Sequence, residues 1–281
     1  MDSAVVRRRE LRVPSARSLL LTVLGEYALP SGEPVWTATL VGVLGVLGVT
    51  EKAARQSLAR TAADGWIVAS RHGRRSQWQL TDAGRRLLTD GAQRIYSFGQ
   101  DHAAWDGRWL VLLTGVPEAG HDRRHILRTR LAWAGFGALP GGVWVSPDPG
   151  REAEAGKILD ELGLASTCLS FVASLGGIGV PEDLVKRAWN LTAVQARYED
   201  FIGRFAPLAP ATDRERLAAQ TLLVHEWRRF PFLDPRLPRE LLPTRWPGDD
   251  AAALFAARHE LWRTGARLCW DSLASNELVA R

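Results

Sequence analysis

The hydrophobic pattern of the first hundred residues predicts helices followed by a hairpin. Apolar side chains recur every three or four positions in three successive segments, residues 15–27, 36–47 and 51–65. Thr50 is placed to cap the third helix and Gly65 to end it. Alternation in residues 66–70 and 76–80 predicts two paired strands, and a further helix is expected from residue 81 to about residue 100. Three helices followed by a hairpin is the order of a winged helix.

From residue 105 onward the apolar pattern indicates strands that alternate with helices. The predicted strands are residues 108–116, 136–146 and 167–175, and the predicted helices are residues 121–134 and 150–163. Such alternation over about 75 residues suits a small ferredoxin-like sandwich, in which a βαβ crossover is right-handed.

Beyond Pro181 the pattern is helical again. Helices are predicted at residues 181–205, 212–230 and 249–275, with a proline-rich segment, residues 231–247, before the last one. The sequence therefore predicts an α+β protein with three domains. These are an N-terminal winged helix-turn-helix domain (residues 1–100), a ferredoxin-like α/β sandwich in the middle (residues 101–180) and a C-terminal helical domain (residues 181–281).

The positive charge is concentrated in the first third of the chain. The 281 residues include 36 Lys and Arg against 31 Asp and Glu, a net charge of +5. Residues 1–100 contain 14 basic and 8 acidic side chains, whereas residues 101–281 contain 22 basic and 23 acidic ones. A basic end on a nearly neutral body indicates a polyanionic partner at that end, most often a nucleic acid.

The remaining composition predicts a protein of the cytoplasm. Two cysteines, Cys168 and Cys269, are too few for a disulfide framework and are expected to be reduced thiols. The first ten residues have charges but no apolar run after them, so we expect no signal peptide. The most apolar window, residues 38–49, is shorter than the ~20 residues of a membrane span, and no membrane partner is expected.

The predicted third helix has the two faces of a DNA recognition helix. Ala54, Leu58 and Ala62 share one face, and the opposite face has four long polar side chains: Lys52, Arg55, Gln56 and Arg60. One face can pack while the other reaches base edges and phosphates. The alternative is a solvated amphipathic helix. This helix, however, is the third of three and directly precedes a basic hairpin, which favours binding of double-stranded DNA. Thr50, at the start of the helix, is expected to be a further DNA contact.

The hairpin tip gathers cations around one glycine. Its residues are Arg71, His72, Gly73, Arg74 and Arg75. Gly73 gives the turn its conformational freedom, and the cations repel one another unless they meet an anion. We therefore expect Arg71, His72, Arg74 and Arg75 to contact phosphates or the minor groove, with a mobile charged loop as the alternative.

Residues 225–247 combine arginines, aromatic rings and prolines. Five prolines restrict the backbone, so a pre-formed irregular corner is expected. Guanidinium groups beside aromatic rings suit a ligand that has phosphates and a flat apolar part. The candidate effector-binding residues are Arg228, Arg229, Arg236, Arg239, Arg245 and Trp246. The alternative is a salt-bridged corner that only docks the C-terminal helices.

Enzyme motifs are weak in this sequence. His121 and His125 are four residues apart on a predicted helix, but without the HExxH pattern a surface pair is the expected reading. His225 is followed by Glu226 but by no second histidine at zinc-binding spacing. Nucleotide-binding, nucleophile-elbow and CxxC patterns are missing. We therefore expect no enzymatic activity, no catalytic residue, no cofactor and no metal.

Four segments together resemble a known family. They read GWIVASRHGRRSQWQLTDAGRRLL at 65–88, RWLVLLTGVP at 108–117, GGVWVSP at 141–147 and HEWRRFPFLDPRLPRELLPTRWPG at 225–248. This combination resembles the PaaX family of bacterial repressors of phenylacetic acid catabolism. The resemblance implies a homodimer, a middle domain with the ferredoxin-like fold of Cas2 nucleases, and release from operator DNA by an acyl-CoA effector, phenylacetyl-CoA or a related aryl-acyl-CoA.

One departure separates the middle domain from Cas2-like nucleases, which place a metal-binding aspartate near the end of the first strand. Here that strand ends Leu113-Thr114-Gly115-Val116-Pro117, with no carboxylate before Glu118. Two-metal hydrolysis needs convergent carboxylates, so a ligand-responsive repressor is the preferred hypothesis. The alternatives are a metal-dependent nuclease built on the middle domain and a DNA-binding protein that responds to no ligand.

Overall fold

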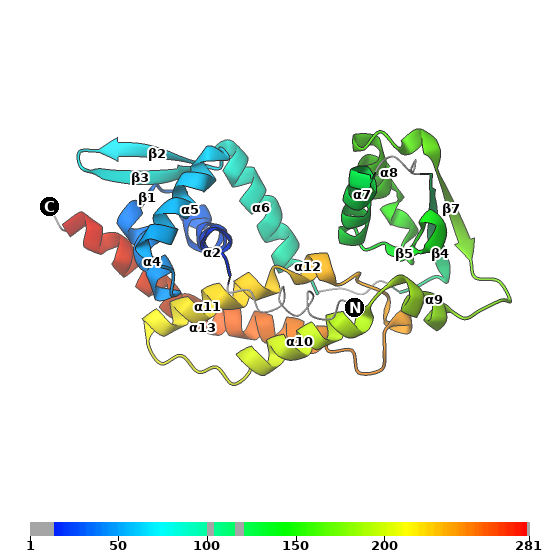
Figure 1. The fold of residues 1–281 in the computed structure, drawn as a ribbon. Helices are drawn as coiled ribbons and strands as arrows, with labels where there is room; N and C mark the ends of the chain where they lie inside the picture. Colours follow the sequence, from blue (N-terminus) through cyan, green and yellow to red (C-terminus); the bar gives the residue numbers. More distant parts are fainter. Residues whose placement is uncertain (1–13, 100–103, 116–120, 280–281) are drawn as a thin grey trace, which may run out of the picture. The chain divides into compact units, whose positions relative to one another are not determined.

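The computed structural model describes residues 14–99, 104–115 and 121–279, which divide into two compact units. The first unit comprises Met1–Ser97, Arg204–Arg228 and Ala253–Arg281, and the second comprises Phe98–Gly203 and Arg229–Ala252 (Figure 1). The last hundred residues therefore contribute to both units. None of the helices in the described ranges has the length and apolarity needed to span a bilayer.

The first unit contains the winged helix. Its elements are α2 (Ala16–Val23), η1 (Leu24–Ala28), α3 (Leu29–Ser31), β1 (Val35–Trp36), α4 (Thr37–Val46), α5 (Glu51–Ala63), β2 (Ile67–His72), β3 (Arg75–Leu80), α6 (Asp82–Tyr96), α11 (Asp213–Trp227), the end of α10 (Leu191–Phe205) and most of α13 (Gly248–Val279). The three strands form an antiparallel sheet in the order β1-β3-β2. Helices followed by a hairpin confirm the predicted fold of this region.

The first helix continues further than its sequence predicts. Ser15 caps α2 by accepting a hydrogen bond from the Ser18 N–H at 3.1 Å. The chain then forms the π-helical segment η1, in which the Leu29 N–H bonds to the Leu24 carbonyl. Pro30 lies in α3, the last helical turn, and does not break the helix. The helix ends instead at Gly32, whose φ is 69°.

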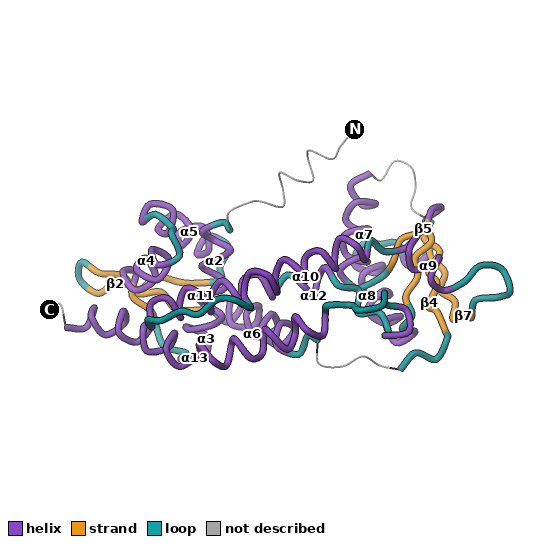
Figure 2. Tube along the Cα trace, turned by 90° about the horizontal axis from the view of Figure 1, so that it is seen from below, coloured by secondary structure: helices purple, strands orange, loops and turns teal. Residues whose placement is uncertain are grey.

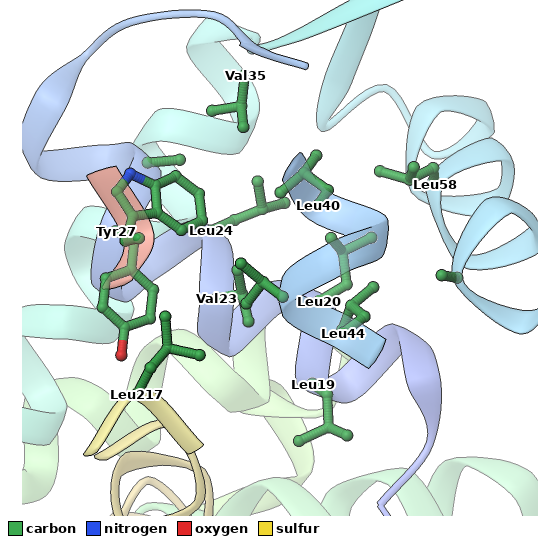
Figure 3. Close-up of a cluster of buried hydrophobic side chains, with 14 of the residues drawn as sticks. Leu19, Leu20, Val23, Leu24, Tyr27, Val35, Leu40, Leu44, Leu58 and Leu217 are labelled. Atoms are coloured by element: carbon green, nitrogen blue, oxygen red, sulfur yellow. The ribbon is translucent and has the colours of Figure 1, made fainter. Parts of the chain in front are cut away.

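The core of this unit is completed by helices from the end of the chain. Leu20 of α2, Leu44 of α4 and Leu58 of α5 lie in one buried cluster (Figure 3). Leu217 of α11 belongs to the same cluster, and Trp270 of α13 stacks on Tyr27 with ring centroids 5.2 Å apart. The winged helix therefore does not bury its core without α11 and α13.

The second unit contains the ferredoxin-like sandwich. Its elements are β4 (Arg108–Thr114), α7 (His121–Trp133), β5 (Gly137–Leu139), η2 (Pro140–Gly142), β6 (Val143–Ser146), η3 (Pro149–Arg151), α8 (Glu152–Glu161), η4 (Ala165–Thr167), β7 (Cys168–Ser174), α9 (Pro181–Ala188), most of α10, α12 (Phe230–Leu233) and η5 (Arg239–Leu241). All strand pairs in the sheet order β5-β6-β4-β7 are antiparallel (Figure 2). This order confirms the predicted fold class.

Several predicted elements are divided in the structure. The strand predicted at residues 136–146 is a hairpin, because η2 contains Gly141 and Gly142 at positive φ and turns the chain back on itself. The helix predicted at residues 181–205 breaks at Trp189, which is extended, and Asn190 then accepts a hydrogen bond from the Ala193 N–H. The helix predicted at residues 212–230 ends at Trp227, before the separate short helix α12.

Candidate nucleic-acid interface

Helix α5 buries one face and exposes the polar face predicted from the sequence. Thr50 caps it, accepting a hydrogen bond from the Ala53 N–H at 3.4 Å. The buried side chains are Ala54, Ser57, Leu58 and Thr61, whereas Ala62 is only half-buried. The exposed side chains include Thr50, Lys52, Arg55, Gln56 and Arg60. The structure therefore presents four long hydrogen-bonding side chains on one exposed helix face.

The polar contacts on this face are local and weak. Arg55 Nε donates to Glu51 Oε1 at 2.8 Å within the same helix, and both side chains are more than half exposed. Arg60 Nε lies 3.4 Å from the Gln56 carbonyl. Lys52 makes no ion pair with any residue that the structure describes. Exposed pairs of this kind contribute about 0.3–0.5 kcal/mol to helix stability, so an external anion can displace them at small cost.

The hairpin tip is tighter than the sequence predicts. His72 pairs with Arg75, so only Gly73 and Arg74 form the turn instead of residues 71–75. Gly73 has a φ of 63° and sits at the first of two turn positions, where a two-residue hairpin loop favours glycine. Arg71, His72 and Arg74 are exposed and Arg75 is half-buried. Burial along β2 does not alternate as predicted, because only Ile67 is buried.

The base of the hairpin is fixed to the helices. Trp78 Nε1 donates to Thr37 Oγ1 at 2.9 Å, and that hydroxyl donates to the Ser76 carbonyl at 3.0 Å. At the other end of the hairpin, a Cβ on Gly84 would lie 2.0 Å from the Trp66 carbonyl oxygen, so only glycine allows α6 to approach this closely. The cationic tip thus projects from an anchored base.

The candidate effector residues do not lie in a single unit. Arg228 belongs to the first unit, where its guanidinium donates to Ser18 Oγ, whereas Arg229, Arg236, Arg239, Arg245 and Trp246 belong to the second. Arg229, Arg236, Arg239 and Arg245 are exposed, and Trp246 is half-buried. The assignment of these residues to an effector stays a prediction.

The corner has an irregular, hydrogen-bonded backbone. Asp234 accepts hydrogen bonds from Tyr198 Oη at 2.6 Å and from the Arg236 N–H at 2.7 Å. Arg236 and Arg245 have φ values of 56° and 62°, in the left-handed region. Burial and the charge of Asp234 raise the pKa of the Tyr198 hydroxyl far above its ordinary value, so it stays a donor.

Two corner side chains have ring or ion-pair contacts that the sequence does not reveal. Trp246 packs edge-on against Tyr198, with ring centroids 5.7 Å apart. Arg239 Nη2 lies 2.6 Å from Asp249 Oδ2 at the start of α13. Scaffold contacts and exposed guanidinium groups are therefore both present in the corner.

Metal-ligating side chains do not gather in the parts of the chain that the structure describes. No group of three or more His, Cys, Asp or Glu side chains there has the arrangement of a metal site. The β4 strand ends at Thr114, and Glu118 lies outside the described residues.

One polar cluster was missed by the sequence analysis. Glu26, Tyr96, Gln220 and His259 meet in the first unit, although they come from four separate segments. The available signal was Glu26 itself, the single charged residue in the apolar stretch from Ser18 to Pro30. A lone carboxylate at such a position is expected to have a buried partner.

Comparisons with known proteins cover most of the chain. Residues 15–84 match the family model described as PaaX-like protein, residues 102–185 the PaaX protein central Cas2-like domain, and residues 189–272 the PaaX-like protein C-terminal domain. The Transcriptional repressor PaaX of Escherichia coli K12 is 35% identical over 253 residues, covering 85% of this chain and 78% of that protein. The structure of the uncharacterized protein Rv0674 from Mycobacterium tuberculosis is similar, with a TM-score of 0.60 and 26% identity over 93% of this chain and 99% of that one.

Proposed function

This chain belongs to the PaaX family, and from that premise we propose that it is a transcriptional repressor of the bacterial cytoplasm. It binds double-stranded operator DNA through the winged helix of its first unit. An aryl-acyl-CoA such as phenylacetyl-CoA releases it. As a regulator it acts by binding and needs no catalytic residue.

The observation that carries the proposal is the exposed face of α5. Lys52, Arg55, Gln56 and Arg60 project from a helix whose other face is anchored by Leu58 and its buried neighbours. Arginine and glutamine can each make paired hydrogen bonds to base edges in the major groove, and lysine neutralises phosphate. Because the ion pair between Arg55 and Glu51 is exposed, the guanidinium can turn to DNA without leaving a buried charge unpaired.

The hairpin supplies the contacts beside the helix. Arg71, Arg74 and Arg75 contact the flanking phosphates or the minor groove, together with His72. A homodimer presents two α5 helices to half-sites that are about one helical turn, or a multiple of it, apart. Thr50 lies at the N-terminal end of α5 and directs its hydroxyl proton to the backbone of the DNA.

The effector is assigned to the corner. The exposed guanidinium groups on Arg229, Arg236, Arg239 and Arg245 of the second unit bind the phosphates of the CoA part, and Arg228 and Trp246 complete the set of residues predicted from the sequence. Release requires that the effector bind the DNA-free conformation more tightly. A hundredfold shift in population takes about 2.7 kcal/mol of differential binding.

Fluorescence anisotropy tests this proposal directly. The purified chain is titrated onto labelled DNA from upstream of its own gene at fixed salt, with and without phenylacetyl-CoA, and onto scrambled DNA. We expect specific binding that the thioester reverses and that free phenylacetate and free CoA leave unchanged. Equal affinity for the scrambled duplex contradicts the repressor assignment. Specific binding that ignores the thioester keeps the repressor and removes this effector.

A further inference from the structure

A cavity of about 660 Å³ that is open to solvent lies in the first unit, on the side of η1 that faces α6, α11 and α13. This volume falls within the range of about 300–1,000 Å³ that is usual for small-molecule sites. Part of its wall is apolar and includes Leu29, Pro30, Ala92 and Leu268. The cavity is separate from the α5 face and contains none of the arginines of the 225–247 corner.

The polar part of the wall is a fixed hydrogen-bond network around Glu26. His259 Nε2 lies 2.7 Å and Gln220 Nε2 lies 2.8 Å from Glu26 Oε1, and the Tyr96 hydroxyl donates to Glu26 Oε2. Burial opposes the charge on this carboxyl, but the bonds from His259, Tyr96 and Gln220 outweigh it and hold its pKa below the ordinary value. Glu26 is thus ionised, and its carboxylate oxygens already accept hydrogen bonds from these three side chains. Its role is therefore to hold Tyr96, Gln220 and His259 in place along the wall.

The side-chain amide oxygen of Gln220 is a hydrogen-bond acceptor that the Glu26 network does not use. Its side chain is 1% exposed and lines the cavity, yet its Oε1 finds no donor among the residues that the structure describes. Reversing the amide would turn this oxygen toward the Glu26 carboxylate and lose the bond to it. Buried amide oxygens nearly always have a donor, which makes this atom an acceptor for a ligand O–H or N–H group. Because the atom itself is buried, the ligand donor reaches it only when the Gln220 side chain turns toward the cavity.

Two arginines give the cavity a positive rim. Arg263 and Arg267 line it from α13, and their partners, Glu260 and Asp271, lie on the same helix outside it. Both ion pairs are at least two-fifths exposed on each side, so an anionic ligand can replace the carboxylates. The other titratable side chains of the wall, Glu26 and His259, already face each other.

We propose that this cavity binds a small organic anion that has a flat apolar body and a hydroxyl or amide donor. The anionic group meets Arg263 and Arg267, the body packs on the apolar wall, and the donor meets Gln220 Oε1. None of the comparisons assigns a ligand to these residues.

The position of the cavity also suits regulation, in an inference that rests on the proposed function. Glu26 and Tyr27 lie on η1, which continues directly from α2, and α2 packs against α5 (Figure 3). A π-helical segment is an irregularity that often accompanies functional sites. A ligand that shifts η1 therefore changes the support of the DNA-facing helix, and we expect it to alter operator affinity.

Isothermal titration calorimetry on the full chain tests the site. The probe is 6-hydroxy-2-naphthoate, which has an anionic group at one end of a flat body and a hydroxyl donor at the other. We expect one site per chain, weaker binding of 2-naphthoate, which has no hydroxyl, and weaker binding of 2-naphthol, which has no charge. Absence of binding by the hydroxynaphthoate overturns the site, and equal affinity for all three overturns the assigned contacts.

Two variants place the ligand in the cavity. R263Q/R267Q removes the rim charges and is expected to weaken binding at least about tenfold. The control R86Q/R214Q makes the same charge change at two exposed arginines outside the cavity and should bind as the wild type does. Ala92→Trp fills the cavity, whereas Ala83→Trp adds the same ring to an exposed position of α6. Normal binding by R263Q/R267Q or by the folded Ala92→Trp variant overturns the placement.

Operator affinity with and without saturating 6-hydroxy-2-naphthoate then tests the coupling. We expect a change in the wild type and none in R263Q/R267Q. An unchanged affinity while calorimetry shows the site filled overturns the regulatory inference alone. If the wild type does not bind its upstream DNA, the proposed function fails, but calorimetry still decides whether the cavity is a ligand site.

Discussion

The arginines of α5 and the hairpin differ from those of the 225–247 corner in their surroundings. Among the residues that the structure describes, the hydrogen bonds and ion pair of Arg55 and Arg60 stay within their own helix, and Arg71 and Arg74 form no ion pair. In the corner, by contrast, Arg239 bonds to Asp249 ten residues away. Arg236 lies over the Phe98 ring, and Arg228 donates to Ser18, 210 positions earlier in the chain.

This difference shows that arginine density alone does not define a polyanion site. An arginine with only local contacts can turn to an external phosphate at small cost, whereas one that ties distant segments together also stabilises the fold. The α5–hairpin region is therefore suited to binding, and the corner has a structural role whether or not it binds an effector. The predictions below separate these two properties.

The largest expected effect concerns the buried face of α5. Leu58 is 1% exposed, so Leu58→Ala removes buried apolar volume and should lower the free energy of unfolding by about 2–5 kcal/mol. Arg60→Ala, on the exposed face of the same helix, should change it by less than about 0.5 kcal/mol. Urea denaturation measures both variants. A similarly small loss of unfolding free energy in both variants would show that α5 does not have the buried and exposed faces on which the comparison depends.

The next effect concerns the exposed face. Arg55→Ala should lower operator affinity by about 1–3 kcal/mol, roughly 5- to 150-fold, and relax one operator position if the guanidinium pairs with a guanine. Glu51→Gln serves as the matched variant, because it breaks the same ion pair and keeps the arginine. It should bind DNA at least as tightly as the wild type. A loss in Glu51→Gln as large as that in Arg55→Ala would assign the effect to helix stability.

A smaller effect is expected from the hairpin tip. If Arg74 and Arg75 each contact a phosphate, R74A/R75A should flatten the plot of log affinity against log salt by about 1.8, because each contact contributes about 0.9. R123A/R124A removes two exposed arginines of α7 in the second unit and serves as the control. An unchanged slope in R74A/R75A would exclude the hairpin from the interface.

Local patterns predicted the α5 face and the hairpin because their residues lie within about 25 positions of one another. Strand and helix alternation also predicted the ferredoxin-like sandwich of the second unit, but with one strand where the structure has the β5–β6 hairpin. Contacts between distant segments could not be predicted in this way. His259 meets Glu26 across 233 positions, and the division of Arg228 from Arg229 between two units depends on packing that no local period reports.

The smallest expected effect concerns the corner and decides between its two roles. The ion pair between Arg239 and Asp249 is exposed, with 70% of the arginine side chain accessible, so breaking it should change the free energy of unfolding by about 0–1 kcal/mol. Arg239→Ala and Asp249→Asn both break it, but only Asp249→Asn keeps the guanidinium. Neither variant should alter operator affinity in the absence of effector.

The two variants should differ once the effector is added. If Arg239 binds a phosphate of an acyl-CoA, Arg239→Ala needs more thioester to release DNA, whereas Asp249→Asn needs the same amount or less because its guanidinium has lost a competing carboxylate. Anisotropy titrations with increasing phenylacetyl-CoA measure both midpoints. Equal midpoints for the two variants and the wild type would leave Arg239 a structural residue, and would make the corner the region that only stabilises the fold.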